Sequence, residues 1–361
     1  MILPVPDYIL AIQPYQPGKP REELEREYGI SDSVKLASNE NPLGPSPLAT
    51  AAIRGCLDSL HRYPDAAGYR LTQGLAAKLG VSPANIVLGN GSDDLIGMLA
   101  RVFLQPGDEV LIPRPAFLMY DITVRAAGAV PVYSPLRGLV IDLEDMARRM
   151  GPKTRMVFIT NPHNPSGSVV TRAAMDQFLA GLPAGVVVVL DEAYVEFVRN
   201  PDSPDGLRYL DEDRLLVTLR TFSKAYGLAG LRIGYGIMPQ SVAELLQRIR
   251  QPFNTNTLAQ AAACAALGDS EHLARTLKAV HEGLAYLQAG LRRMQVRYFE
   301  TEANFFLLDL ERDAAAVHQK LLQQGVIVRP MGGYGYPLYL RVNAGIPSEN
   351  ERFLKALVAA L

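Results

Sequence analysis

Four short segments of the chain place polar and charged side chains directly after apolar runs, where they could carry out chemistry. They are residues 89–94, 160–167, 186–194 and 220–234. Ligands of open α/β sheets bind beyond the carboxyl ends of the strands, so these positions are the first candidates for a functional site. Each segment alone also has a structural explanation, such as a helix cap, a tight turn or an exposed charge.

The first segment favours the binding of a phosphate. Residues 89–94 read Gly-Asn-Gly-Ser-Asp-Asp between an apolar run and a helical pattern, and backbone N–H groups at the start of a helix attract anions. The segment nearly matches the dinucleotide fingerprint G-x-G-x-x-G, but Asp94 stands in place of the third glycine. Because its carboxylate would repel a pyrophosphate, a phosphate monoester is favoured over a nicotinamide dinucleotide.

The second and third segments each offer one polar anchor. Two X-Pro steps stiffen the loop 160–167, so the loop can present Asn164 with little loss of entropy. Asp191 follows the apolar run 186–190, where a carboxylate is unfavourable unless it has a partner. A protonated ring nitrogen would be such a partner.

The fourth segment contains a lysine in a mostly apolar stretch. Burial lowers the pKa of a lysine, so the amine of Lys224 would be available for Schiff-base chemistry with an aldehyde. Thr221, Ser223 and Arg232 lie nearby in the sequence and could donate hydrogen bonds to a phosphate. Together the four segments match pyridoxal 5'-phosphate (PLP), because its phosphate, phenolic oxygen, pyridine nitrogen and aldehyde each find one anchor.

The four segments are part of a wider sequence similarity to a known family, which covers nearly the whole chain. The sequence resembles the PLP-dependent aminotransferases of fold type I and, among them, the histidinol-phosphate aminotransferases. The four central segments carry the resemblance to the superfamily. The narrower group is indicated by residues 14–18 (PYQPG), 36–44 (LASNENPLG), 63–65 (YPD), 303–306 (ANFF), 328–331 (VRPM) and 339–342 (YLRV).

The resemblance implies a role at the cofactor for each candidate residue. Lys224 would form the internal aldimine and then move a proton between the substrate and the cofactor, while Asp191 would pair with the pyridinium nitrogen. Tyr194 and Asn164 would hydrogen-bond the phenolate oxygen. Phe117 would stack on the ring, at a position where the family usually has a tyrosine. The residues expected around the phosphate are Gly91, Ser92, Asp93, Thr221, Ser223 and Arg232.

Asp93 is an unusual neighbour for a phosphate because its side chain is also an anion. We therefore expect the backbone N–H of Asp93, rather than its carboxylate, to face the phosphate.

The resemblance also implies the substrates and the assembly. Arg341 resembles the arginine that binds the α-carboxylate of glutamate, since a guanidinium matches a carboxylate in geometry. Arg329 and Tyr15 resemble the pair that contacts the substrate's own phosphate, and Asn164 is also expected among the substrate-binding residues. The implied reaction is a ping-pong transamination between glutamate/2-oxoglutarate and L-histidinol phosphate/imidazole-acetol phosphate, in histidine biosynthesis. Tyr63 would reach the phosphate bound by a neighbouring subunit, which implies a homodimer with shared active sites.

Other functions stay open at this point. An aromatic-amino-acid aminotransferase and a threonine-phosphate decarboxylase share the implied fold, and the preferred amino acceptor does not follow from the sequence. A regulator that binds PLP without catalysis is disfavoured, because no spare segment could supply a DNA-reading helix-turn-helix. A nicotinamide-dependent dehydrogenase is disfavoured by Asp94.

The elements that would position these residues follow from the hydrophobic pattern. Apolar runs at 85–88, 109–113, 155–160, 186–190 and 215–219 alternate with helical patterns such as 95–104 and 120–127. This alternation predicts an α/β fold with a mostly parallel sheet flanked by helices.

The pattern changes after about residue 240. Long helices are predicted over 241–250 and 257–293, followed by strands at 296–300, 305–308, 326–328 and 339–342 around a helix at 314–324. We therefore predict an N-terminal arm (1–47) with a short helix at 21–28, a large PLP-binding α/β domain (48–250) and a small C-terminal α+β domain (251–361).

The composition disfavours several other classes of protein. The chain of 361 residues has 36 Lys and Arg against 37 Asp and Glu, and 48% of its residues are hydrophobic. These values are typical of a globular protein rather than of a disordered chain or a nucleic-acid binder. No apolar run is long enough to cross a membrane, and no secretory signal is recognisable, which predicts a cytoplasmic protein. The spacing of the histidines and cysteines predicts neither a metal site nor a disulfide framework.

Overall fold

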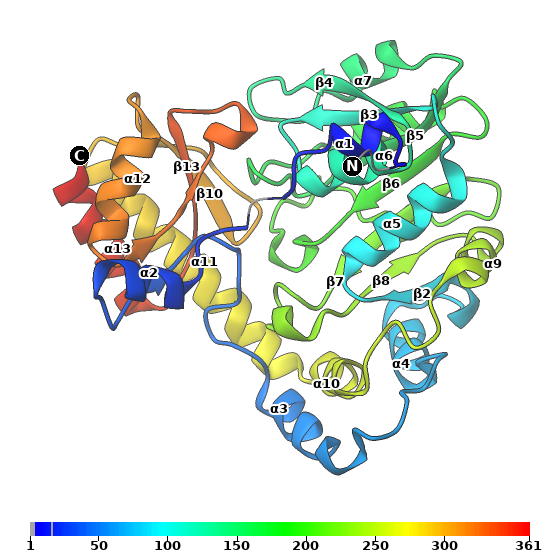
Figure 1. Cartoon of the computed structure of the whole chain (residues 1–361), viewed down its shortest axis with the longest axis horizontal. Helices are drawn as coiled ribbons and strands as arrows, with labels where there is room; N and C mark the ends of the chain where they lie inside the picture. Colours follow the sequence, from blue (N-terminus) through cyan, green and yellow to red (C-terminus); the bar gives the residue numbers. More distant parts are fainter. Residues whose placement is uncertain (1–3, 16) are drawn as a thin grey trace.

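The computed structural model describes residues 4–15 and 17–361 and shows two lobes of unequal size (Figure 1). The larger lobe is built on a seven-stranded sheet with the order β2-β8-β7-β6-β5-β3-β4. Neighbouring strands run parallel, except that β8 is antiparallel to β2 and β7. The predicted α/β fold with a mostly parallel sheet is thus confirmed. The strands are β2 (Ile86–Gly89), β3 (Glu109–Arg114), β4 (Val130–Pro135), β5 (Thr154–Thr160), β6 (Val187–Asp191), β7 (Leu216–Thr221) and β8 (Gly234–Ile237).

Strand β6 shows why this sheet has helices on both faces. Successive side chains of a strand point to opposite faces, so an apolar run must be covered twice. Val187 and Val189 pack into the core on one face, with α5, α6 and α9. Val188 and Leu190 pack into the core on the other face, with α7 and α8. These helices are α5 (Ser92–Phe103), α6 (Leu118–Ala126), α7 (Leu143–Arg149), α8 (Arg172–Ala180) and α9 (Gln240–Ile249).

Three more helices pack at the β2 end of the sheet and share one apolar core with β2 and β8. They are α3 (Pro47–Arg54), α4 (Tyr69–Leu79) and α10 (Thr257–Gly268). Asp269 ends α10 and caps the next helix, because its carboxylate accepts the N–H of His272. The predicted helical stretch 257–293 is therefore divided into two helices at this residue.

The smaller lobe has a four-stranded sheet in the order β12-β13-β10-β9, in which neighbours are antiparallel. Phe305, Phe306 and Phe353 are fully buried in its core. Its strands are β9 (Arg297–Tyr298), β10 (Phe305–Asp309), β12 (Arg329–Pro330) and β13 (Tyr339–Asn343), and its helices are α11 (Ser270–Arg293), α12 (Ala314–Gln323) and α13 (Pro347–Ala360).

The N-terminal residues run along both lobes. Helix α1 (Asp7–Leu10) lies beside α6 of the larger lobe, whereas α2 (Arg21–Tyr28) lies on the smaller lobe (Figure 1). Leu24 of α2 is buried against Leu322 and Ile327. Strand β1 (Val34–Lys35) pairs in parallel with β11 (Val326–Ile327). The predicted helix at 21–28 is thus present, and the division of the chain at residues 47 and 250 stays a prediction. Over the described ranges, the helices are each too short or too polar to span a membrane.

Candidate active site

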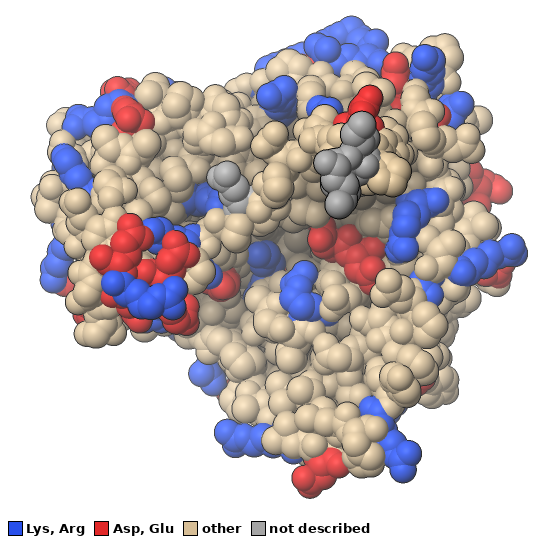
Figure 2. Space-filling model, viewed as in Figure 1, with Lys and Arg blue, Asp and Glu red and all other residues tan. Residues whose placement is uncertain are grey.

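A pocket opens in the hollow between the two lobes (Figure 2), beyond the carboxyl ends of the central strands. All but two of the residues predicted for the site line this pocket. They are Tyr15, Ser92, Asp93, Phe117, Asn164, Asp191, Tyr194, Thr221, Ser223, Lys224, Arg232, Arg329 and Arg341. Residues from four separate predicted segments and from both lobes therefore meet at one place.

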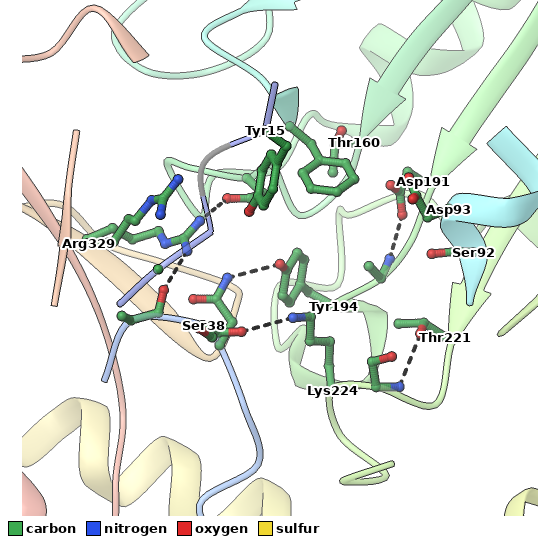
Figure 3. A pocket seen from close by; sticks show the side chains of 18 of the residues that line it. Tyr15, Ser38, Ser92, Asp93, Thr160, Asp191, Tyr194, Thr221, Lys224 and Arg329 are labelled. Carbon is green, nitrogen blue, oxygen red and sulfur yellow. Dashed lines mark hydrogen bonds between the residues drawn. The ribbon is translucent and has the colours of Figure 1, made fainter. Parts of the chain in front are cut away.

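Lys224 lies in the turn after β7, and its amine points into the pocket (Figure 3). Its Nζ donates a hydrogen bond of 3.1 Å to the backbone oxygen of Ser38. Burial, and to a smaller extent Arg341, lower the pKa of Lys224 to about 8, while Glu40 opposes the shift. Near neutral pH a useful fraction of this side chain is the free amine, which is the form that attacks an aldehyde.

Asp191 ends β6 and is almost completely buried. Its Oδ1 accepts the backbone N–H of Ala193 at 3.1 Å, and its Oδ2 accepts the hydroxyl of Tyr120 at 2.5 Å. Burial raises the pKa of Asp191, while these hydrogen bonds oppose that rise. A carboxylate in this setting is stabilised by a cation, such as a protonated ring nitrogen.

Tyr194 stands next to Lys224, whose Nζ lies 5.8 Å from the centre of the tyrosine ring. Its hydroxyl accepts a hydrogen bond of 3.0 Å from Nδ2 of Asn39, and burial raises the pKa of Tyr194 to about 12. The hydroxyl therefore stays protonated and can donate to an anionic oxygen. Phe117, directly before α6, adds an aromatic face to the pocket.

The start of α5 and the turn after β7 form a cradle for an anion. Gly91 caps α5 with φ 79°, and a Cβ on it would lie only 2.4 Å from Nη2 of Arg232. Glycine thus lets the guanidinium lie against the helix N-terminus. Arg232 also donates to Oγ of Ser223 at 3.2 Å. A helix N-terminus combined with a guanidinium and hydroxyl groups fits the phosphate of PLP.

Asp93 lies in the same wall of the pocket, beside Asp191 (Figure 3). Its Oδ1 is buried without a hydrogen-bond partner among the described residues. Burial raises the pKa of Asp93, and Arg232 opposes this rise. The expected orientation of its backbone N–H toward a phosphate stays a prediction.

Two arginines of the smaller lobe face the pocket. Arg341 on β13 and Arg329 on β12 are direct partners in the sheet register. Arg341 is buried and donates to Oδ1 of Asn164 at 2.5 Å and to the backbone oxygen of Ala37 at 2.9 Å. Its Nε has no partner in the part of the chain that the structure describes. A buried guanidinium with a spare donor favours an anionic ligand.

Tyr63 and Gly91 are the predicted residues that do not line the pocket. Gly91 does not line the pocket, but it is the N-cap residue of α5, whose first residues do. Tyr63 is 82% exposed and stacks on Phe253 at a ring distance of 4.6 Å. Its predicted contact with a phosphate therefore depends on a second subunit.

The structure also adds pocket residues that sequence analysis missed. They are Gly18, Ala37, Ser38, Asn39, Thr160, Ala193 and Tyr334. Most lie inside or beside the sequence segments singled out above, so their position was a usable signal. Tyr120 had no such signal, because it is a fully buried aromatic residue that resembles ordinary core. Groups of three or more potential metal ligands are absent from residues 4–15 and 17–361.

Comparisons with known proteins point to one family. The family model "Aminotransferase class I and II" matches residues 31–357. Histidinol-phosphate aminotransferase 2 of Pseudomonas aeruginosa is 48% identical over 348 residues, which cover 96% of this chain and 94% of that protein. Histidinol-phosphate aminotransferase of Moorella thermoacetica is 46% identical and covers 97% of this chain and 91% of its own.

Solved structures agree with these sequence matches. The crystal structure of histidinol-phosphate aminotransferase from Sinorhizobium meliloti, in complex with pyridoxal-5'-phosphate, has a TM-score of 0.92 and 28% identity, and the match covers 100% of this chain and 98% of that one. A double mutant of Thermus thermophilus aspartate aminotransferase has a TM-score of 0.85 at 24% identity, with full coverage of both chains, which shows a shared fold.

Proposed function

The chain belongs to the class I and II aminotransferases, and from this premise we propose that it is a histidinol-phosphate transaminase. It would exchange an amino group between glutamate/2-oxoglutarate and L-histidinol phosphate/imidazole-acetol phosphate. The observation that carries the proposal is one pocket that combines the amine of Lys224 with the guanidinium groups of Arg329 and Arg341. The proposal is also supported by the names of the relatives that share nearly half of its sequence.

The residues of the pocket fit PLP as the cofactor. When bound, PLP supplies an electron sink that stabilises negative charge at the α-carbon of the substrate. Lys224 would hold the cofactor through its amine, and Asp191 would keep a proton on the ring nitrogen. Tyr194 and Asn164 would bind the phenolic oxygen, and Phe117 would cover the ring. The phosphate would be held at the start of α5 by Ser92, Thr221, Ser223 and Arg232.

Lys224 has a second task once the substrate amine has taken its place. Its Nζ, with a pKa lowered to about 8, would accept a proton from the α-carbon of the substrate and pass it to C4′ of the cofactor. The backbone oxygen of Ser38 accepts a hydrogen bond from this Nζ and holds the amine in the pocket. Lys224 is therefore the general base and acid of the proposed reaction.

The two arginines account for a reaction in two halves. Glutamate brings carboxylates, whereas histidinol phosphate has a phosphate and no carboxylate. Arg341 and Arg329 offer guanidinium groups that bind either anion, so the two substrates would occupy the same place in turn. Tyr15, from the N-terminal part of the chain, lines the pocket and would add a hydroxyl that binds the substrate's phosphate. Successive occupation of one site is the structural basis of a ping-pong scheme.

We also propose a homodimer with shared active sites. Large apolar side chains are exposed along one stretch of the chain, namely Leu48, Leu57, Leu60, Tyr63 and Tyr69. Apolar surface of this kind is typical of a protein interface. In the dimer, Tyr63 of one subunit would contact the cofactor phosphate of the other. A cytoplasmic location stays a prediction.

A panel of substrates tests the proposed function. Purified protein with PLP and glutamate is assayed for 2-oxoglutarate with imidazole-acetol phosphate or with phenylpyruvate as the acceptor. A third assay measures CO₂ release from threonine phosphate, and Lys224→Ala serves as the inactive control. We expect the highest kcat/KM with imidazole-acetol phosphate. A preference for phenylpyruvate would identify an aromatic-amino-acid aminotransferase, and CO₂ release would identify a decarboxylase.

A further inference from the structure

We propose that Tyr120 is a positioning residue of the active site, which fixes the orientation and the charge of the Asp191 carboxylate. The inference rests on the proposed function, because it concerns how Asp191 would hold the ring nitrogen of PLP. Tyr120 is completely buried in α6 and does not line the pocket, so it acts through Asp191.

A chain of hydrogen bonds leads from the sheet to the carboxylate. The Oη of Tyr120 lies 2.5 Å from Oδ2 of Asp191 and 2.8 Å from Oγ1 of Thr160. A tyrosine hydroxyl has one proton, and the carboxylate can only accept, so Tyr120 donates to Asp191 and Thr160 donates to Tyr120. Thr160 and Asp191 are direct partners in the register of β5 and β6. The register of the sheet therefore fixes the distance between Thr160 and Asp191, the two residues that Tyr120 connects by hydrogen bonds.

Both oxygens of the carboxylate are held in this arrangement. Tyr120 binds Oδ2, while the backbone N–H of Ala193 binds Oδ1 at 3.1 Å. Two donors on different oxygens fix the plane of the carboxylate. Each oxygen still has a lone pair that can accept an N–H from the pocket. The group is thus oriented before any ligand arrives.

The ring of Tyr120 is fixed as firmly as its hydroxyl. It stacks on Phe158 with the ring centres 4.4 Å apart and the planes at 9°. It meets Phe117 edge to face at 5.5 Å. Phe117 lines the pocket. Tyr120 therefore supports both the residue proposed to cover the cofactor ring and the carboxylate proposed to hold its nitrogen.

The hydroxyl of Tyr120 also affects the position of the proton that Asp191 would share with the ring nitrogen of PLP. Burial and the nearby Asp93 raise the pKa of Asp191, whereas Tyr120, Ala193 and Lys224 lower it. Without the Tyr120 hydroxyl the carboxylate becomes more basic. The proton between it and a pyridine nitrogen then shifts toward the carboxyl group, which leaves a neutral ring that is a weaker electron sink.

Tyr120→Phe isolates this effect, because it removes the hydroxyl and keeps the aromatic packing. A matched control is Tyr209→Phe, since Tyr209 is a buried tyrosine outside the pocket whose hydroxyl donates to Asp176 at 2.8 Å. Each holoenzyme is prepared with PLP labelled with ¹⁵N in the ring, and the ¹⁵N chemical shift is measured by NMR. The dissociation constant of PLP from each protein and the separate values of kcat and KM are also measured.

We expect the ¹⁵N resonance in Tyr120→Phe to move toward the value of a neutral pyridine, with a fall in kcat and little change in KM. PLP should also bind more weakly, by less than the about tenfold expected for losing a direct hydrogen bond to a charged group, because Tyr120 acts on PLP only through Asp191. Tyr209→Phe should match the wild type in all three measurements. An unchanged resonance in folded Tyr120→Phe would overturn the inference and leave the proposed function intact.

A second variant covers the case in which Tyr120→Phe does not fold. Thr160→Val keeps both Tyr120 and Asp191 but removes the donor to the tyrosine, so a smaller shift of the resonance in the same direction is expected. An unchanged resonance in that variant would likewise overturn the inference. A wild-type protein that fails to bind PLP would overturn the inference together with the proposed function.

Discussion

At the scale of single residues, the pocket holds charged groups in surroundings that disfavour their charge. Burial lowers the pKa of Lys224 and of Arg341 and raises that of Asp191. Each of these groups gains from a ligand of complementary chemistry: an aldehyde for the amine, an anion for the guanidinium and a ring cation for the carboxylate. This shared need is the physical reason to treat them as one site.

The lowered pKa of Lys224 predicts how the protein takes up its cofactor. Only the free amine attacks the aldehyde of PLP, so the rate of PLP capture by the apoprotein should rise with pH and level off above about pH 8. Stopped-flow absorbance measures this rate between pH 6 and pH 10. A lysine with its ordinary pKa near 10.4 would instead give a rate that still increases at pH 10.

The polar residues at strand ends could be predicted from the sequence, because a charged residue after an apolar run is recognisable from the order of residues alone. Tyr120 could not be predicted in this way, and the segment 36–44 did not reveal which contact Asn39 makes. Their roles arise from contacts across the fold, with Asp191 for Tyr120 and with Tyr194 for Asn39. Such contacts join residues that are far apart in the sequence, so they emerge only once the sheet has formed.

At the scale of elements, the junction between β2 and α5 places the phosphate cradle. Gly91→Ala introduces a Cβ that would collide with Arg232, at a position whose φ of 79° already disfavours alanine. We expect PLP to bind at least about tenfold more weakly, because a charge-assisted contact is displaced. Titration of the apoprotein with PLP, followed by absorbance, measures this change.

Gly107→Ala is the matched control for this variant. Gly107 has φ 90°, but a Cβ there would meet nothing within 4 Å. It should lower the free energy of unfolding by about 1 kcal/mol through backbone strain and leave PLP affinity unchanged. Equal PLP affinities for the two variants would show that Gly91 has no special part in the cradle.

Two strands that sequence analysis missed have identifiable causes. Strand β8 contains Gly234, where a Cβ would lie 2.5 Å from the backbone nitrogen of Ser92. The glycine is needed for close approach to α5, and it weakens the strand pattern. Strand β4 contains two prolines and was missed for that reason, yet it lies at the edge of the sheet, where proline is tolerated. By contrast, the apolar run that became β6 was recognised within one residue.

At the scale of the whole molecule, the site depends on parts that are distant in the sequence. The larger lobe supplies Lys224 and Asp191, the smaller lobe supplies Arg329 and Arg341, and the N-terminal residues supply Tyr15 and Ser38. The proposed dimer adds Tyr63, which is exposed in the single chain. Neither lobe alone contains a complete site.

Mixed dimers test whether active sites are shared. Lys224→Ala and Tyr63→Ala are co-expressed with different tags, and the mixed dimer is purified. At limiting PLP each parent homodimer should have little activity. The mixed dimer should recover about half of the wild-type activity, because one of its two sites is complete.

The same experiment with Tyr69→Ala provides the control. Tyr69 is also exposed on this surface, but no role in the site is proposed for it, so its homodimer should be active by itself. A Lys224→Ala/Tyr63→Ala dimer as inactive as its parents would contradict shared sites.

The central claim is that the amine of Lys224 holds PLP covalently. The most direct measurement is reduction of the PLP-loaded protein with borohydride, followed by proteolysis and mass mapping of the peptides. We predict a single phosphopyridoxyl group, on the peptide that contains Lys224. The same group on any other lysine, or no modified peptide at all from PLP-saturated protein, would contradict the account.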